Sequence, residues 1–161
     1  PTGGYLINNT EPTVRYAEVS LIYAEALNEL SDGVTYEIEK YNGEMITIQR
    51  DWREMQKGIK PIRMRAGLPD YTETLNQNQN NFRIRIKRER QIELLGENCM
   101  RYFDLRRWKD AITEENQLLQ GFNISISDDA THIQEFYEPT IITSVHKAFK
   151  QRMYLWPFPT Y

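Results

Sequence analysis

The sequence predicts a mainly α fold of antiparallel helix pairs, with one β-hairpin and an extended C-terminal segment. Three observations lead to this prediction. Several segments are apolar on nearly every side at helical periodicity, short links containing glycine join them, and Asn42-Gly43 separates two short alternating runs. Helices of that kind pack between neighbours, as in the stacked helix pairs of tetratricopeptide repeats.

Length and composition limit the number of domains and the kinds of site that this chain can contain. A chain of 161 residues fits one domain with a real core, so a single helical domain over residues 1–161 is expected. The formal net charge of −3 gives no general reason to expect nucleic-acid or membrane binding. A single cysteine, Cys99, excludes an internal disulfide and any Cys-cluster metal site. No apolar run is long enough to span a bilayer, and no signal peptide or lipid-attachment cysteine is visible. Both ends look cut, so a fragment of a longer protein is expected.

Four helices are expected from apolar periodicity and from the residues that end helices. The first is stopped by Ser31-Asp32-Gly33, and the second by Gly67 and Pro69. The expected ranges are 15–30, 51–66, 82–97 and 100 to about 119. After Gly121 the sequence favours extended structure: residues 123–127, a short strand at 139–144, and residues 153–156 leading into two prolines.

The hairpin is expected over residues 34–49. Tyr36 and Ile38 alternate with glutamates before the Asn42-Gly43 pair, and Ile46 and Ile48 alternate with Thr47 after it. Asn-Gly between alternating runs is a strong hairpin signal, because both turn residues must accept a positive φ. An isolated hairpin is marginally stable, so this one is expected to lean on the helices.

The most informative stretch is the charged segment from residue 82 to residue 112. On a helix, Ile84, Ile92 and Leu95 share one stripe with Arg88 in its middle, while Phe82 and Ile86 lie opposite, beside three glutamates. The next segment places Arg101 and Asp104 in a second stripe, formed by Met100, Leu105, Trp108, Ala111 and Ile112. A lone buried charge is too costly, so these charges are expected to pair or to cap helix ends. Specifically, Arg101 and Asp104 are expected to form a largely buried network with Glu93 or Glu97.

The same spacing resembles the C-terminal signature of the SusD/RagB family, nutrient-binding lipoproteins of the Bacteroidetes outer membrane. The matching residues are Arg88, Glu89, Arg90, Glu93, Leu94, Glu97, Arg101, Asp104, Leu105, Arg107 and Trp108. Segments 15–30, 62–69 and 154–159 agree in the family's order. There are two departures: Asn98 stands where glycine is usual, and one extra residue lies between Glu97 and Arg101, so a different turn is expected.

The resemblance carries several implications. It covers most of this chain but only the last third or so of a typical member. It implies non-catalytic binding of an oligosaccharide or other nutrient at the cell surface, beside a SusC-like TonB-dependent transporter. It also implies membrane attachment only through a lipid anchor outside this fragment, and it implies no cofactor.

Catalytic and metal chemistry find little support in the sequence. His132 and His146 are far apart and have no ligand partner at helical spacing, and there is no phosphate loop or nucleophile elbow. Glu89, Glu93 and Glu97 share a helix face, but each has an Arg or Lys within one turn. Such cations stabilise the charged carboxylate rather than the protonated form that a general acid needs. We therefore expect no catalytic residue, no metal site and structural ion pairs instead.

Nucleic acid is also not expected. Residues 83–109 contain nine cations and four carboxylates, but the cations point all round the helix instead of sharing one exposed face.

Aromatic residues are the remaining guide to ligands, since sugar rings stack on aromatic faces. Most of them lie in the family-like segments, where packing between helices is expected. Tyr41 and Trp52 lie outside those segments and are the ligand-binding candidates. Two interpretations therefore compete: a fragment of a nutrient-binding lipoprotein, and a helical-repeat scaffold that binds a protein partner.

Overall fold

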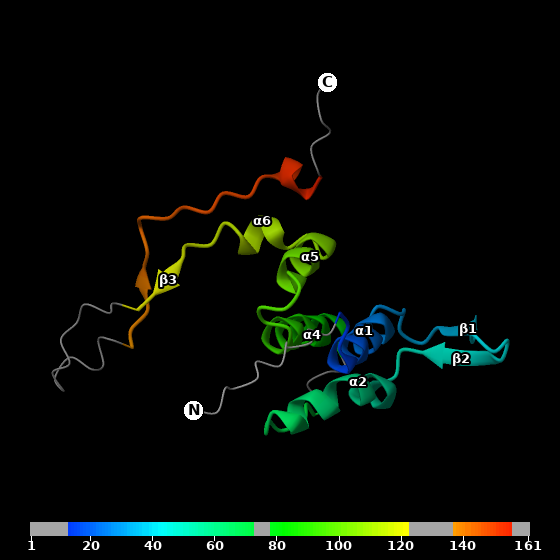
Figure 1. Ribbon diagram of the computed structural model, residues 1–161. Coiled ribbons are helices and arrows are strands. Elements are labelled where there is room, and N and C mark those ends of the chain that lie inside the picture. Colours follow the sequence, from blue (N-terminus) through cyan, green and yellow to red (C-terminus); the bar gives the residue numbers. More distant parts are fainter. Residues whose placement is uncertain (1–12, 73–77, 123–136, 156–161) are drawn as a thin grey trace, which may run out of the picture. The chain divides into compact units, whose positions relative to one another are not determined.

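The computed structural model describes residues 13–72, 78–122 and 137–155. The chain divides into two compact units, Pro1–Met100 and Arg101–Tyr161, and each is treated by itself. Helices dominate the described residues, and one hairpin interrupts them (Figure 1). The mainly α fold with a hairpin is confirmed, whereas the single domain over residues 1–161 stays a prediction.

Helix α1, Tyr16–Asn28, forms the centre of the first unit and confirms the first expected helix. Its buried positions recur every three or four residues, from Ala17 through Leu21 and Ala24 to Leu27. The opposite side is exposed, including Tyr16 at 83%. The helix is therefore buried along one side, where the sequence predicted burial on nearly every side.

Helix α2, Trp52–Arg65, packs against α1 and confirms the second expected helix. Its N-cap is Asp51, whose carboxylate accepts a hydrogen bond from the Glu54 amide at 3.1 Å. The two helices run antiparallel and approach closely at Gly58, where an added Cβ would lie 2.3 Å from the carbonyl oxygen of Ser20.

Strands β1, Thr35–Glu39, and β2, Met45–Gln49, form the hairpin between α1 and α2. Gly43 has φ +81°, but Asn42 does not have a positive φ, so the expectation that both turn residues adopt one is wrong. The loop has three residues instead of two: the Gly43 amide donates to the Lys40 carbonyl at 2.9 Å, and Lys40 donates to Glu44 at 2.8 Å. A type I turn followed by a left-handed glycine gives this geometry.

Helix α4, Gln79–Glu93, completes the first unit and packs on α1. Phe82 and Ile86 are fully buried in the core that α1, α2 and α4 share. The stripe of Ile84, Ile92 and Leu95 is 57–76% exposed, so the expectation that α4 is sandwiched on both sides is not met within the described residues. The helix also ends four residues before Glu97, because the chain turns at Gly96 with φ +78°.

The second unit corrects the last expected helix. The single helix from Met100 to about Leu119 is instead two helices, α5, Met100–Arg107, and α6, Ala111–Glu114. Lys109 adopts φ +63° between them, which ends α5 without any glycine or proline. Leu105 and Ala111 pack with Phe149 in a small core of their own, and Tyr154 lies against it.

The remaining elements are short. Strands β3, Gln120–Gly121, and β4, Thr140–Ile141, pair antiparallel, which confirms a strand near residues 139–144. A 3₁₀ helix, η1, covers Gln151–Tyr154, so the extended path expected from residue 153 is wrong up to Tyr154. The strand expected at 123–127 and the segment 156–159 lie outside the described residues. Within the part of the chain described, no helix has the length and apolar character needed to cross a membrane.

Candidate functional site

Arg15, the residue before α1, joins the start of that helix to the end of α4. Its Nε donates to Glu97 Oε2 at 2.7 Å, its Nη1 to Glu93 Oε1 at 3.0 Å, and its Nη2 to the Glu93 carbonyl at 2.8 Å. The Glu97 hydrogen bond, and then Glu93, raise the pKa of Arg15 above its ordinary value. Arg65 of α2 also bonds Glu93, so this carboxylate holds the ends of three helices together.

A second ion pair lies deeper, between α2 and α4. Arg63 bonds Glu89 through Nη1, and both side chains are nearly buried, with exposed fractions of 12% and 6%. The Tyr71 hydroxyl donates to the same carboxylate at 2.6 Å, and the Arg63 guanidinium lies 3.9 Å from the centre of the Tyr71 ring. Burial, with the Glu89 hydrogen bond second, raises the pKa of Tyr71 to about 12. Arg63 Nε donates to the Pro69 carbonyl at 2.8 Å, so this arginine also fixes the loop after α2.

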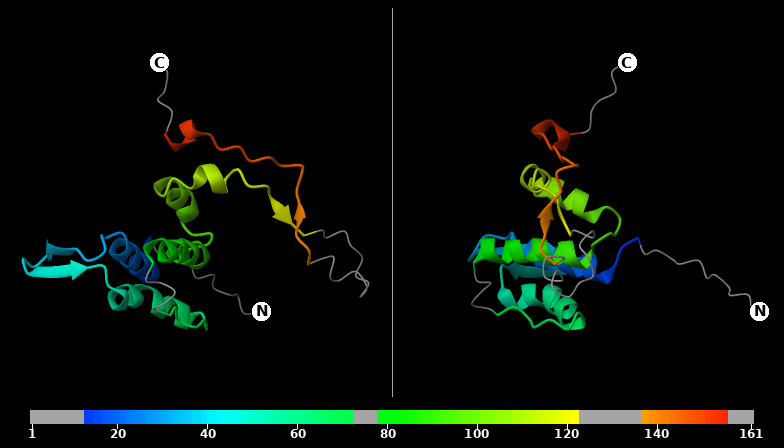
Figure 2. Two further views of the ribbon diagram at one scale, coloured as in Figure 1. Left: turned by 180° about the vertical axis from the view of Figure 1, so that it is seen from behind. Right: turned by 90° about the vertical axis from the view of Figure 1, so that its left-hand side faces the viewer.

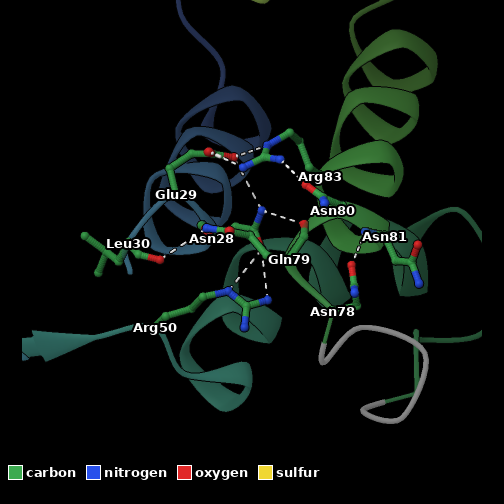
Figure 3. Close-up of polar contacts among 9 residues, drawn as sticks. All are labelled: Asn28, Glu29, Leu30, Arg50, Asn78, Gln79, Asn80, Asn81 and Arg83. Atoms are coloured by element: carbon green, nitrogen blue, oxygen red, sulfur yellow. Dashed lines mark hydrogen bonds and ion pairs between the residues drawn. The ribbon is translucent and has the colours of Figure 1, made fainter. Parts of the chain in front are cut away.

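A polar junction joins the C-terminal end of α1 to the start of α4 (Figure 3). Asn28 is fully buried, and its side-chain amide donates to the Gln79 carbonyl at 3.1 Å. Gln79 returns the bond, donating to the Asn28 carbonyl at 2.6 Å and to the Leu30 carbonyl at 3.2 Å. These bonds satisfy carbonyls that a helix end leaves open, so the junction caps α1 with residues of α4.

Two arginines surround this junction. Arg50, which follows the hairpin, donates to Asn28 Oδ1 through Nε and Nη2 and to Asp32 at 2.9 Å. Arg83 of α4 makes a bidentate pair with Glu29, at 2.7 and 2.6 Å. The Arg83 hydrogen bond lowers the pKa of Glu29 below its ordinary value.

The remaining charged residues between Arg88 and Arg107 differ in burial and in the partners that they contact. Arg90 is buried in α4, whereas Arg88 is exposed. In the second unit, Arg101 donates to Glu114 at 3.0 Å, and the buried Asp104 accepts from Arg107 at 3.0 Å. The Arg107 guanidinium lies 5.0 Å from the centre of the Trp108 ring.

The network expected of Arg101 and Asp104 with Glu93 or Glu97 would join the two units, and it stays a prediction.

The two ligand candidates lie in different surroundings. Tyr41 is fully exposed in the hairpin loop. Trp52 is half-buried at the start of α2 and packs edge-on against Phe82, with ring centres 5.5 Å apart. A shallow groove of about 380 Å³ lies between the first turn of α1 and the last turns of α2; its lining includes Tyr16 and Arg65.

The chemistry available to these groups is structural. The three glutamates expected to share a face of α4 each bond an arginine, so their carboxylate oxygens are engaged in ion pairs between elements of the first unit. His146 is exposed, and His132 lies outside the described residues. Among the residues described, no three His, Cys, Asp or Glu side chains gather as a metal site would require.

Comparisons with known proteins give a family and a solved structure with a similar fold. The SusD family model matches residues 1–161. The chain belongs to the SusD family. It is also similar to the crystal structure of a SusD-like protein from Bacteroides fragilis NCTC 9343, with a TM-score of 0.60 and 29% identity. That match covers 88% of this chain and 21% of the other, so the chain spans about a fifth of its relative's length. A search of curated proteins gives no match.

Sequence reasoning missed the basic partners of the signature glutamates. Arg15, Arg63 and Arg65 hold Glu89, Glu93 and Glu97, although no local spacing relates them. The available signal was that all three arginines lie in the other family-like segments, 15–30 and 62–69. Charges in separate segments of one family signature are candidates for pairing with one another.

Proposed function

We propose that this chain is part of a non-catalytic protein that binds a glycan or another nutrient at the bacterial outer-membrane surface. The observation that carries the proposal is the SusD family match over residues 1–161, supported by likeness to a SusD-like protein across 88% of the chain. The carboxylate pairing in the first unit supports a non-catalytic role, because the glutamates that could serve as acid or base are engaged with arginines.

The whole protein would work as the lipoprotein partner of a SusC-like TonB-dependent transporter. In this proposal a lipid anchor outside residues 1–161 supplies the membrane attachment. Co-purification of the tagged, full-length protein from outer membranes tests it, with the transporter identified by mass spectrometry. Recovery of the protein from the soluble fraction without any transporter would contradict it.

Within this chain, Tyr41 is the better ligand candidate of the two. Its ring is fully exposed, so one face is available to stack on a sugar ring. Trp52 contacts Phe82 and helps to close the core, so any ligand contact would use only the part of its ring that stays exposed. We therefore expect Tyr41→Ala to weaken any binding by this chain more than a change at Trp52 that leaves the fold intact.

Calorimetry with a panel of oligosaccharides tests the site. The matched control is Tyr16→Ala, which removes another highly exposed tyrosine of the same unit. Binding that Tyr41→Ala weakens at least tenfold and Tyr16→Ala leaves unchanged would support the hairpin site. Binding that neither variant alters would exclude it. A chain that binds nothing, compared with a full-length protein that binds, would place the ligand contacts elsewhere in the protein.

A helical-repeat scaffold that binds a protein partner is the alternative, and one observation favours it. Ile84 and Ile92 on α4, and Leu95 just after the helix, are exposed apolar residues, and Arg88 is exposed between the two isoleucines. The scaffold function would replace the glycan function if two results were obtained. The full-length protein would bind a protein partner but no glycan of the panel, and Ile92→Glu would abolish binding of that partner.

A further inference from the structure

The outer edge of strand β2 is open. Lys40 donates to the Glu44 carbonyl at 2.8 Å, and the strand register pairs Ile38 with Ile46. Antiparallel pairs alternate between bonded and non-bonded, so Ile46 and Ile48 direct their backbone groups toward β1. Met45, Thr47 and Gln49 therefore direct theirs outward, and no strand among the described residues pairs with them. The hairpin projects away from α1 and α2, which leaves this edge accessible (Figure 2).

The hairpin also has an apolar face with little cover. Tyr36, Ile38, Ile46 and Ile48 share that face, and all four are at least partly exposed, Ile38 at 42%. A two-stranded hairpin with an uncovered apolar face is marginally stable, and additional strands would stabilise it. Its base is nevertheless fixed, because the Arg50 side chain is 6% exposed and bonded to α1.

The two edges of the hairpin differ in charge. Glu37 and Glu39 lie on β1 at positions whose backbone groups point outward. Charged side chains at an edge discourage pairing with another strand, and β1 has that protection. Strand β2 reads Met-Ile-Thr-Ile-Gln, with no charge and no proline, so nothing in its sequence prevents pairing.

We propose that the β2 edge pairs with the β2 edge of a second copy of this chain, antiparallel about Thr47. In that register Met45 lies opposite Gln49 and Thr47 opposite its own counterpart, and these are the residues whose backbone groups point outward. Ile46 then meets Ile48 of the partner copy on the apolar face, where cross-strand β-branched pairs stabilise a sheet.

The twofold arrangement also suits the charges. The two copies form one four-stranded sheet whose apolar faces lie on the same side, and the β1 strands become its outer edges. Glu37 and Glu39 of the two copies are then separated by both β2 strands. Five paired residues bury less than the roughly 1,200 Å² of a standard interface, so the dissociation constant should be on the order of 0.1–1 mM.

Sedimentation equilibrium of the full chain, over concentrations up to about 1 mM, tests the proposal. Thr47→Pro removes an outward N–H without removing a bond between β1 and β2. The matched control is Glu37→Pro, because Glu37 lies directly opposite Thr47 and the change is the same one on the β1 edge. Wild type and Glu37→Pro should dimerise, and Thr47→Pro should associate at least tenfold more weakly.

A second variant covers the case in which proline unfolds the hairpin. Thr47→Lys keeps the backbone N–H and places two like charges opposite each other at the twofold axis, so it should also weaken dimerisation, less so at high salt. A wild type that stays monomeric to about 1 mM would overturn the proposal. So would dimers that persist in Thr47→Lys, or equal effects of the two proline variants with the hairpin intact, because either result places the contact elsewhere.

Discussion

Removing Arg63 should be among the most destabilising charge deletions in the first unit. Glu89 is 6% exposed, and it accepts bonds from Arg63 and from Tyr71 only among the contacts described. Arg63→Ala would leave this carboxylate buried with a single neutral donor and would also free the Pro69 carbonyl. Stranding one partner of a buried pair costs about 3–5 kcal/mol.

Arg65→Ala is the matched control, because it deletes the same side chain two residues further along the same helix. Arg65 is 59% exposed, and its partner Glu93 keeps the bonds from Arg15. An exposed ion pair contributes about 0–1 kcal/mol, so Arg65→Ala should be nearly neutral. The two variants should therefore differ by about 3 kcal/mol in the free energy of unfolding.

Urea denaturation followed by tryptophan fluorescence measures this difference, since Trp52 packs on the core of the same unit. The double variant Arg63→Met/Glu89→Leu removes both buried charges and should be more stable than Arg63→Ala alone. If Arg63→Ala and Arg65→Ala agree to within about 0.5 kcal/mol, burial does not govern these pairs and the reasoning is refuted.

Three further results are expected. Gly58→Ala should raise helix propensity but lower the stability measured by urea denaturation by about 1–3 kcal/mol, because its Cβ would meet the Ser20 carbonyl; a gain in stability would contradict this. The pKa of Tyr71 is raised to about 12 in the folded chain, so its contribution to stability is complete below about pH 10 and is lost as pH rises toward 12. The difference between wild type and Tyr71→Phe in an ultraviolet titration measures that pKa, and a value near 10 would exclude the buried hydrogen bond. The Arg83 hydrogen bond lowers the pKa of Glu29, so the contribution of Glu29 to stability is complete above the ordinary pKa of a glutamate and is lost as pH falls through the lowered pKa. Glu29→Gln should therefore make the free energy of unfolding less dependent on pH in that acid range, and an unchanged dependence would contradict this prediction.

Local signals predicted most of the first unit. Apolar spacing and capping residues located α1 and α2, and the Asn-Gly pair located the hairpin, because the sequence near each element determines those features. The turn type was not predictable in the same way. Asn42-Gly43 is compatible with two positive φ values, but Tyr41 enters the loop and only Gly43 adopts one.

Two errors came from features that local sequence does not determine. The stripe of Ile84, Ile92 and Leu95 is as apolar as the stripe of Phe82 and Ile86, and periodicity alone does not say which one faces neighbours. The interruption between α5 and α6 at Lys109 is not marked by a glycine or a proline in the sequence. In both cases the packing of distant residues decides the outcome, and one sequence does not display that packing.

The position of the arginine–glutamate pairs bears on where ligand contacts should be sought. Arg15 lies 78 residues from Glu93, so their pair closes a long stretch of chain and ties α1 to the end of α4. A guanidinium whose donors already bond two carboxylates and a carbonyl has few left for a sugar hydroxyl, and the buried Arg63–Glu89 pair is out of reach of one. We therefore expect Arg15, Arg63 and the glutamates that they bond to stabilise the first unit rather than to contact a ligand. Ligand or partner contacts made by this unit should come from exposed side chains that are not engaged in these ion pairs, such as Tyr41 on the hairpin and Ile92 on α4.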